Sequence, residues 1–226
     1  MTVPFYVPPE QLVKDRADFA RKGVARGRPI VVATMDAGIL FVGENSSPSL
    51  RKIGEVYDRI AFAGVGRFNE FETLRVAGVR YADLKGYSYA RPDVTAKGLA
   101  NAYSQTLGQI FAHEIKPYEV DIIVAEVGSV LADDKLFRIG FDGTLRDAHG
   151  LAVLGGGEDE ITEAMTGTVT PDMAVQDALR VMCDAIEQAT DRPIPDDAWE
   201  TGLLERNGRR RKFRRLSIED VAASRS

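Results

Sequence analysis

Two apolar, β-branched segments near the N-terminus constrain the fold of this chain more than any other feature. Ile30–Thr34 and Ile39–Gly43 are separated by Asp36-Ala37-Gly38, and this turn signal predicts a β-hairpin. Neither strand alternates polar and apolar residues, so both faces of the hairpin are expected to be buried. The fold must therefore place protein on both sides of this sheet.

The rest of the chain supplies further strands and helices in clusters. Strands are predicted at Lys52–Tyr57, Arg59–Val65, Val120–Val127, Leu136–Phe141, Leu151–Leu154, Gly202–Glu205 and Arg211–Leu216. Helices are predicted at Pro9–Arg26, 67–82, 94–115, 158–166, 172–189 and from Ser217 onward. This order fits neither a strict β-α-β repeat nor a helical bundle. It predicts an α+β fold in one domain, residues 1–226, with two sheets packed face to face and helices covering both outer faces.

Composition excludes several classes of protein. The net charge of −5 is unlike that of a dedicated nucleic-acid binder. Cys183 is the only cysteine, which rules out an internal disulfide and a cysteine-rich zinc site. Met1–Glu10 has no signal-peptide pattern, and no apolar run approaches the ~20 residues of a membrane span. We expect a cytoplasmic protein with no membrane contact.

Known catalytic and cofactor motifs are incomplete in this sequence. No second histidine follows His113-Glu114 at the spacing of a zinc protease helix, and no G-x-S-x-G element accompanies His113 or His149. Counting residues alone leaves a Ser-His-Asp triad open. Gly64-Val65-Gly66 and Gly155-Gly156-Gly157 complete no phosphate-binding loop and are expected to form tight turns. We therefore expect no metal and no cofactor.

A basic run at 209–215 has two interpretations. It could bind nucleic acid, in which case the affinity would depend strongly on salt. Alternatively, it is one strand of a hairpin with its charges toward solvent or toward an acidic partner subunit. Asn207-Gly208, a strong hairpin signal, and the acidic total favour the second interpretation.

Several segments together resemble one family, the α subunits of the proteasome core, in its actinobacterial branch. They are Pro8-Pro9-Glu10-Gln11, Phe19–Gly27 leading into Ile30–Gly43, Ser49–Ile53, Ile60–Gly66, Lys116–Val120 and Leu136–Gly143. The resemblance covers nearly the whole chain. It implies the four-layer αββα sandwich of N-terminal-nucleophile hydrolases, which agrees with the fold class expected from the pattern.

The resemblance also implies that this chain has no catalytic residues. Catalytic relatives begin their first strand with a threonine whose hydroxyl attacks and whose own amine serves as base. Here that position is Arg28, and a charged helix precedes it, whereas Glu44 and Lys52 occupy the positions of the acid and the lysine. The alternative is a self-contained N-terminal-nucleophile hydrolase, which would need Ser, Thr or Cys after a cleavage site.

In such a subunit, Lys52 and Gly27 would line a pocket for the C-terminal carboxylate of a ring-shaped ATPase activator. Residues 1–9 would form a gate over the axial pore, and residues 10–26 a helix that packs on a neighbouring subunit. The expected partners are other α subunits in a heptameric ring, proteasome β subunits and the activator. The gate residues are Thr2, Val3, Pro4, Phe5, Tyr6, Val7, Pro8 and Pro9.

Overall fold

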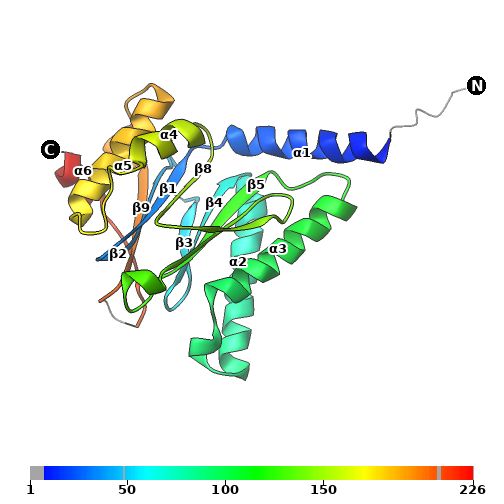
Figure 1. Cartoon of the computed structure of the whole chain (residues 1–226), viewed down its shortest axis with the longest axis horizontal. Coiled ribbons are helices and arrows are strands. Elements are labelled where there is room, and N and C mark those ends of the chain that lie inside the picture. The colour runs from blue at the N-terminus through cyan, green and yellow to red at the C-terminus, as the bar shows by residue number, and fades with distance from the viewer. Residues whose placement is uncertain (1–7, 48, 208–209, 226) are drawn as a thin grey trace, which may run out of the picture.

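The computed structural model describes residues 8–47, 49–207 and 210–225. Two five-stranded antiparallel sheets pack against each other, and helices cover the outer face of each sheet (Figure 1). The predicted α+β sandwich with four layers is therefore confirmed. The gate residues Thr2 to Val7 lie outside the described residues.

The first sheet contains the hairpin that dominated the sequence pattern. Its strands are ordered β10-β9-β2-β1-β8. They span β1 Ile30–Met35, β2 Gly38–Glu44, β8 Leu151–Leu154, β9 Trp199–Glu205 and β10 Phe213–Arg215. Met35 pairs with Gly38, so only two residues connect β1 to β2. Gly38 has φ 145°, and a Cβ there would lie 1.9 Å from the Leu204 carbonyl oxygen, which is why this turn requires glycine.

The second sheet has the order β3-β4-β5-β6-β7. Its strands are β3 Ile53–Tyr57, β4 Ile60–Gly66, β5 Val120–Glu126, β6 Lys135–Ile139 and β7 Leu145–Ala148. Sequence analysis missed β7, because this edge strand is short and buries no residue fully. It also started β9 three residues late, at Gly202, because Glu200 interrupts the apolar pattern of a strand that is in fact buried from Trp199 to Leu204.

Two helical layers enclose the sheets. Helices α2 Phe68–Ser88 and α3 Ala96–His113 pack on the second sheet, and α4 Glu158–Met165, α5 Val175–Thr190 and α6 Ile218–Arg225 pack on the first. Short 3₁₀ turns occur at Arg91–Asp93, Leu131–Asp133 and Asp196–Ala198. The prediction ended α2 six residues early. The helix predicted from Ser217 onward begins with a capping box, because the side chains of Ser217 and Asp220 each accept a hydrogen bond from the other's backbone N–H.

Three layers of apolar side chains explain why the first hairpin lacks alternation. Val31, Ala33 and Met35 of β1 face the helices α4, α5 and α6. Ile30 and Val32, on the opposite face of the same strand, meet the second sheet. Each fully buried aliphatic side chain of this size stabilises the fold by about 1.5–3 kcal/mol. Both faces of β1 therefore contribute to the core, as the sequence predicted.

Helix α1, Pro9–Ala25, projects from this body (Figure 1). Pro9 is its first residue, and proline is tolerated there because the first N–H of a helix has no intrahelical acceptor. Only Ala20 and Val24 are buried, and Leu12, Val13 and Phe19 remain 49%, 53% and 45% exposed. The charged helix predicted before β1 is therefore present, and it buries little surface within its own domain.

Candidate functional site

The connection between α1 and β1 carries an arginine at the position where catalytic relatives would carry their nucleophile. The guanidinium of Arg28 contacts the carboxylate of Glu44, the last residue of β2, whose side chain is only 1% exposed. The guanidinium of Arg192 contacts the other oxygen of the same carboxylate. Two cations thus compensate one buried anion, as a buried carboxylate requires. The arrangement offers charge pairing and no hydroxyl or thiol.

Lys52 lies beside this arginine, directly before β3. Its Nζ donates a hydrogen bond to the carbonyl oxygen of Arg28 at 3.1 Å. Burial lowers the pKa of the Lys52 ammonium from 10.5 to about 8; the Glu200 carboxylate opposes this shift and the Arg28 guanidinium adds to it. The structure therefore brings Lys52 next to the Gly27–Arg28 segment, although the two are far apart in sequence.

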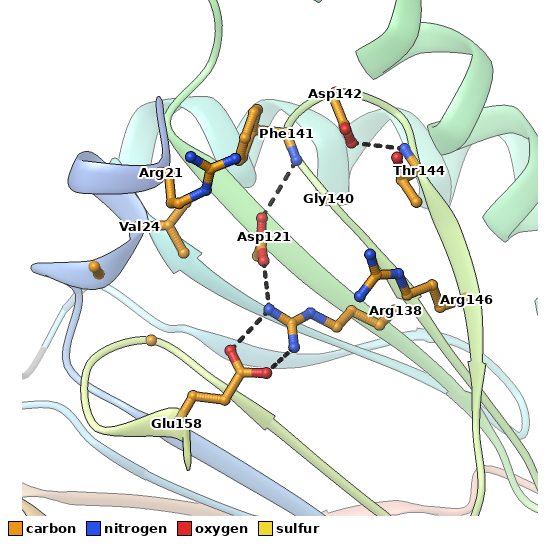
Figure 2. A pocket seen from close by; sticks show the side chains of 12 residues that line it. Arg21, Val24, Asp121, Arg138, Gly140, Phe141, Asp142, Thr144, Arg146 and Glu158 are labelled. Carbon is orange, nitrogen blue, oxygen red and sulfur yellow. Dashed lines mark hydrogen bonds and ion pairs between the residues drawn. The ribbon is translucent and has the colours of Figure 1, made fainter. Parts of the chain in front are cut away.

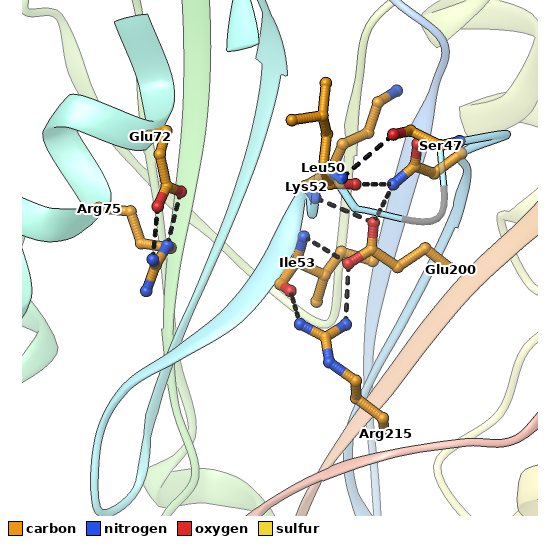
Figure 3. Close-up of polar contacts among 9 residues, drawn as sticks. Ser47, Leu50, Lys52, Ile53, Glu72, Arg75, Glu200 and Arg215 are labelled. Carbon is orange, nitrogen blue, oxygen red and sulfur yellow. Dashed lines mark hydrogen bonds and ion pairs between the residues drawn. The ribbon is translucent and has the colours of Figure 1, made fainter. Parts of the chain in front are cut away.

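A buried carboxylate from β9 organises the residues around Lys52. Glu200, with its side chain 2% exposed, accepts hydrogen bonds from the backbone N–H groups of Lys52 at 2.9 Å and Ile53 at 3.2 Å. It also accepts from the Arg215 guanidinium at 2.8 Å (Figure 3). Asn45 Nδ2 donates to the same carboxylate at 2.6 Å. We call these five residues the Glu200 cluster. Sequence analysis did not single out Glu200, and the only available signal was an acidic residue in an otherwise apolar strand.

Gly27 has a structural reason to be glycine. A Cβ at this position would lie 2.2 Å from Cγ1 of Val65 and 2.9 Å from the Val24 carbonyl oxygen. The N–H of Gly156 donates to the Gly27 carbonyl at 2.9 Å, so the triple-glycine loop closes on the same segment. Gly155 adopts φ 99°, which confirms that these glycines form tight turns.

A second charged cleft, of about 300 Å³, lies between α1, the β6–β7 turn and the start of α4 (Figure 2). Arg138 of β6 binds the carboxylates of Asp121, at 2.9 Å, and Glu158. Burial disfavours the charged form of Arg138, but its hydrogen bonds to Glu158 and Asp121 raise its pKa overall. Burial also raises the pKa of Asp121, although the hydrogen bond from Arg138 works in the opposite direction. Arg138, Asp121 and Glu158 pair with one another, so this part of the cleft is an ion-pair network.

The other candidate residues considered from sequence are the two histidines. His113 and His149 are exposed, and the latter lies in the turn between β7 and β8. Among the described residues, no group of three histidine, cysteine, aspartate or glutamate side chains could hold a metal ion. Within the same part of the chain, no helix is long and apolar enough to cross a membrane.

The basic run near the C-terminus is paired with carboxylates of this chain. Leu204 faces Phe213, so β9 and β10 form the predicted hairpin, although the connection is longer than a two-residue turn at Asn207-Gly208. Gly208 and Arg209 lie outside the described residues. The ion pairs are Arg210–Asp58, Arg211–Glu55, Arg214–Glu205 and Arg215–Glu200. This pairing favours the hairpin interpretation over a nucleic-acid patch.

Comparison with known proteins gives a consistent result over nearly the whole chain. The family model described as "Proteasome subunit" matches residues 7–197. "Proteasome subunit alpha" of Thermomonospora curvata is 54% identical over 227 residues, which cover 99% of this chain and 99% of that protein. The proteins of the same name from Sanguibacter keddieii and Pseudarthrobacter chlorophenolicus are 52% and 51% identical over 99% of this chain, and the matches cover 91% and 99% of those proteins.

Proposed function

This chain belongs to the proteasome subunit family and is an α-ring subunit; from this premise we propose that it has no peptidase activity, gates the core particle and docks a ring-shaped ATPase activator. Its partners are other α subunits, in a heptameric ring, and β subunits that supply the catalytic threonines. The particle works in the cytoplasm, where it degrades unfolded, tagged proteins.

One observation carries the absence of peptidase activity. At the start of β1, the Arg28 guanidinium contacts the buried Glu44 carboxylate, where catalysis would need a free hydroxyl beside a free α-amine. Helix α1 precedes this position and keeps it internal to the chain. A self-contained N-terminal-nucleophile hydrolase would need processing before a hydroxyl or thiol, and Arg28 offers neither.

The docking function rests on the environment of Lys52. Lys52 is half-buried at an edge of the sandwich, and its ammonium donates a hydrogen bond to the Arg28 carbonyl oxygen. An ammonium with further donors and little solvent is suited to pair with the terminal carboxylate of a partner chain. Gly27 precedes Arg28, and its lack of a Cβ lets the segment that ends at Arg28 pack against Val65. The alternative is an ordinary lysine at a strand start.

Gating and assembly rest on α1. The helix carries Leu12, Val13 and Phe19 on its surface, and apolar side chains in such a cluster are typical of a protein interface. Neighbouring α subunits would cover them in the ring. Residues 1–9, which enter this helix, would then lie near the pore and close it.

The direct test is covalent labelling of this chain. The full-length protein, alone and assembled with β subunits, is incubated with a threonine-directed epoxyketone, and each subunit is weighed by mass spectrometry. We expect stoichiometric labelling of the β subunits and none of this chain, with no cleavage of fluorogenic peptides by this chain alone. Labelling of this chain would overturn the proposal and favour the hydrolase alternative.

A native mass spectrum tests the assembly. We expect this chain and its β subunits to form a particle that contains rings of seven copies. A stable monomer in the presence of β subunits would contradict the ring, whatever the result of the labelling experiment.

A further inference from the structure

We propose that Glu200 is a positioning residue for Lys52: its carboxylate anchors the first residues of β3 so that the ammonium stays at the Arg28 carbonyl. The inference rests on the proposed docking function for its biological meaning. The contacts between Glu200 and Lys52 lie within this chain, so they can be tested without any activator.

The anchoring contacts reach Lys52 through its own backbone. Glu200 Oε2 accepts from the N–H of Lys52 at 2.9 Å, and Oε1 accepts from the N–H of Ile53 at 3.2 Å (Figure 3). Lys52 stands just before β3, where its carbonyl already accepts from the N–H of Gly64 in β4 at 3.0 Å. The lysine backbone is thus held by one sheet through its carbonyl and by the other sheet through Glu200.

Glu200 itself is held from two sides. Arg215 in β10 donates to Glu200 Oε1 at 2.8 Å and also donates to the Ile53 carbonyl at 2.7 Å. Asn45 donates to Glu200 Oε2 at 2.6 Å. The same amide nitrogen lies 2.6 Å from the Leu50 carbonyl, so the loop that leads into Lys52 shares the anchor.

The site requires a carboxylate rather than any acceptor. Four donors converge on two oxygens: two backbone N–H groups, an amide and a guanidinium. An ionised carboxylate has about four lone-pair sites and carries no hydrogen, so it can accept a hydrogen bond from every one of these donors. Glutamine would direct an NH₂ group at two of them and leave buried donors unsatisfied, which is costly where the side chain is 2% exposed.

The charged groups around Lys52 come from several separate parts of the chain. Arg28 approaches from the α1–β1 connection, with Glu44 and Arg192 paired on its far side. Glu200 approaches from β9 with Arg215 of β10 behind it. Glu200 therefore supplies the negative charge next to Lys52, and its carboxylate works against the fall in the pKa of Lys52 that burial causes. Loss of the anchor would let the ammonium move into water.

The experiment measures the titration of Lys52 in the full-length chain. Trace acetylation with acetic anhydride over pH 6–11 modifies neutral amines, and peptide mass spectrometry reports each lysine separately. The variants are Glu200→Gln and Arg215→Gln. The matched control is Glu205→Gln, because Glu205 lies on the same strand and pairs with Arg214 of β10 at the same 2.8 Å, but at the surface. Lys116, which pairs with Glu70, is the internal reference.

We expect the midpoint for Lys52 to be near 8 in the parent and in Glu205→Gln. In Glu200→Gln it should rise by about one pH unit or more toward the value of an exposed lysine, with a smaller rise in Arg215→Gln. An unchanged midpoint in both variants would overturn the inference. A fall would overturn it too, because Lys52 would then have stayed in place and lost only a neighbouring charge. If Glu200→Gln does not fold, Arg215→Gln, which keeps the carboxylate, decides alone.

A binding arm separates this inference from the docking proposal. A fluorescein-labelled pool of heptapeptides with free C-terminal carboxylates is compared with the same pool after amidation, by anisotropy. We expect carboxylate-dependent binding to fall roughly tenfold or more in Glu200→Gln and to persist in Glu205→Gln. If the parent binds the two pools equally, the docking proposal is wrong, and the acetylation midpoint of Lys52 remains the test of the role of Glu200. If Glu200→Gln binds the free-carboxylate pool as well as the parent does, positioning fails and docking stands.

Discussion

The first turns of α1 and the start of β3 differ in how many contacts they make with the rest of this chain. Around Lys52, four donors meet the Glu200 carboxylate and a fifth bond joins the ammonium to Arg28. In α1, no residue before Ala20 is buried, and Leu12 and Val13 are about half exposed. The lysine site is therefore built before any partner arrives, whereas the helix presents apolar surface that only a partner can cover.

This difference separates two ways of making an interface. A preorganised site loses little conformational entropy on binding, so more of the free energy of its charge pairing contributes to affinity. An exposed amphipathic helix gains most of its stability from packing, so its contribution depends on assembly. The same chain would thus meet its activator with a rigid site and its neighbouring subunits with a surface completed by the ring.

The largest expected effect is at the prebuilt site. Lys52→Ala should weaken binding of the free-carboxylate peptide pool by a factor well above ten, because removing one member of a desolvated charge pair costs roughly 2–5 kcal/mol. Lys52→Arg, which keeps the charge but changes its shape, should lose part of the affinity. Because the ammonium is the binding form, affinity in the parent should also fall as the pH rises through about 8. Equal binding by Lys52→Ala would make Lys52 an ordinary strand-start lysine.

A smaller effect is expected when the apolar face of α1 is broken. Leu12→Asp should weaken ring assembly by about 1–2 kcal/mol per contact, since a partly exposed leucine would lose the burial that a neighbour provides. Lys14→Asp, on the same helix and exposed, is the control for charge. Native mass spectrometry over a dilution series measures both. If the two variants dissociate at the same concentration, the interface does not use this face.

Removing the buried charge should increase stability while it removes docking. Lys52→Met is expected to raise the free energy of unfolding by about 0.5–2 kcal/mol at pH 7. The folded chain binds the Lys52 proton more weakly, with a pKa of about 8, than the unfolded chain, with 10.5. Stability of the parent therefore rises between pH 8 and 10.5, and the advantage of methionine should shrink over that window. Urea unfolding of both proteins at pH 7 and 10 provides the measurement; a loss of stability at pH 7 would contradict it.

The smallest expected effect concerns the segment before α1. Deleting residues 2–8 in the assembled particle should speed hydrolysis of a small fluorogenic peptide severalfold without an activator, because the proposed gate over the pore would be gone. The deletion should leave the Lys52 midpoint and peptide binding unchanged. An unchanged hydrolysis rate would argue against a gate.

Several parts of the candidate site could be predicted from sequence and others could not. Arg28, Glu44 and Lys52 were identified through the resemblance, and the structure places Lys52 against the Arg28 backbone. Glu200 was missed because one acid in a run of apolar residues looks like the end of a strand. Its role depends on four donors from three other parts of the chain, and no local pattern encodes that convergence.

The apolar runs by themselves determined the layered architecture, because a strand without alternation can exist only between two layers of protein. They could not determine that β7 adds an edge strand or that the basic hairpin pairs with acids on β3 and β9. Those outcomes depend on which charged groups meet once the sheets are packed, and Coulomb energies depend on distance and burial rather than on order in the chain. The pKa of Lys52 is the clearest case: its sequence neighbours are ordinary, and its value of about 8 arises from burial, with Arg28 adding to the shift and Glu200 opposing it.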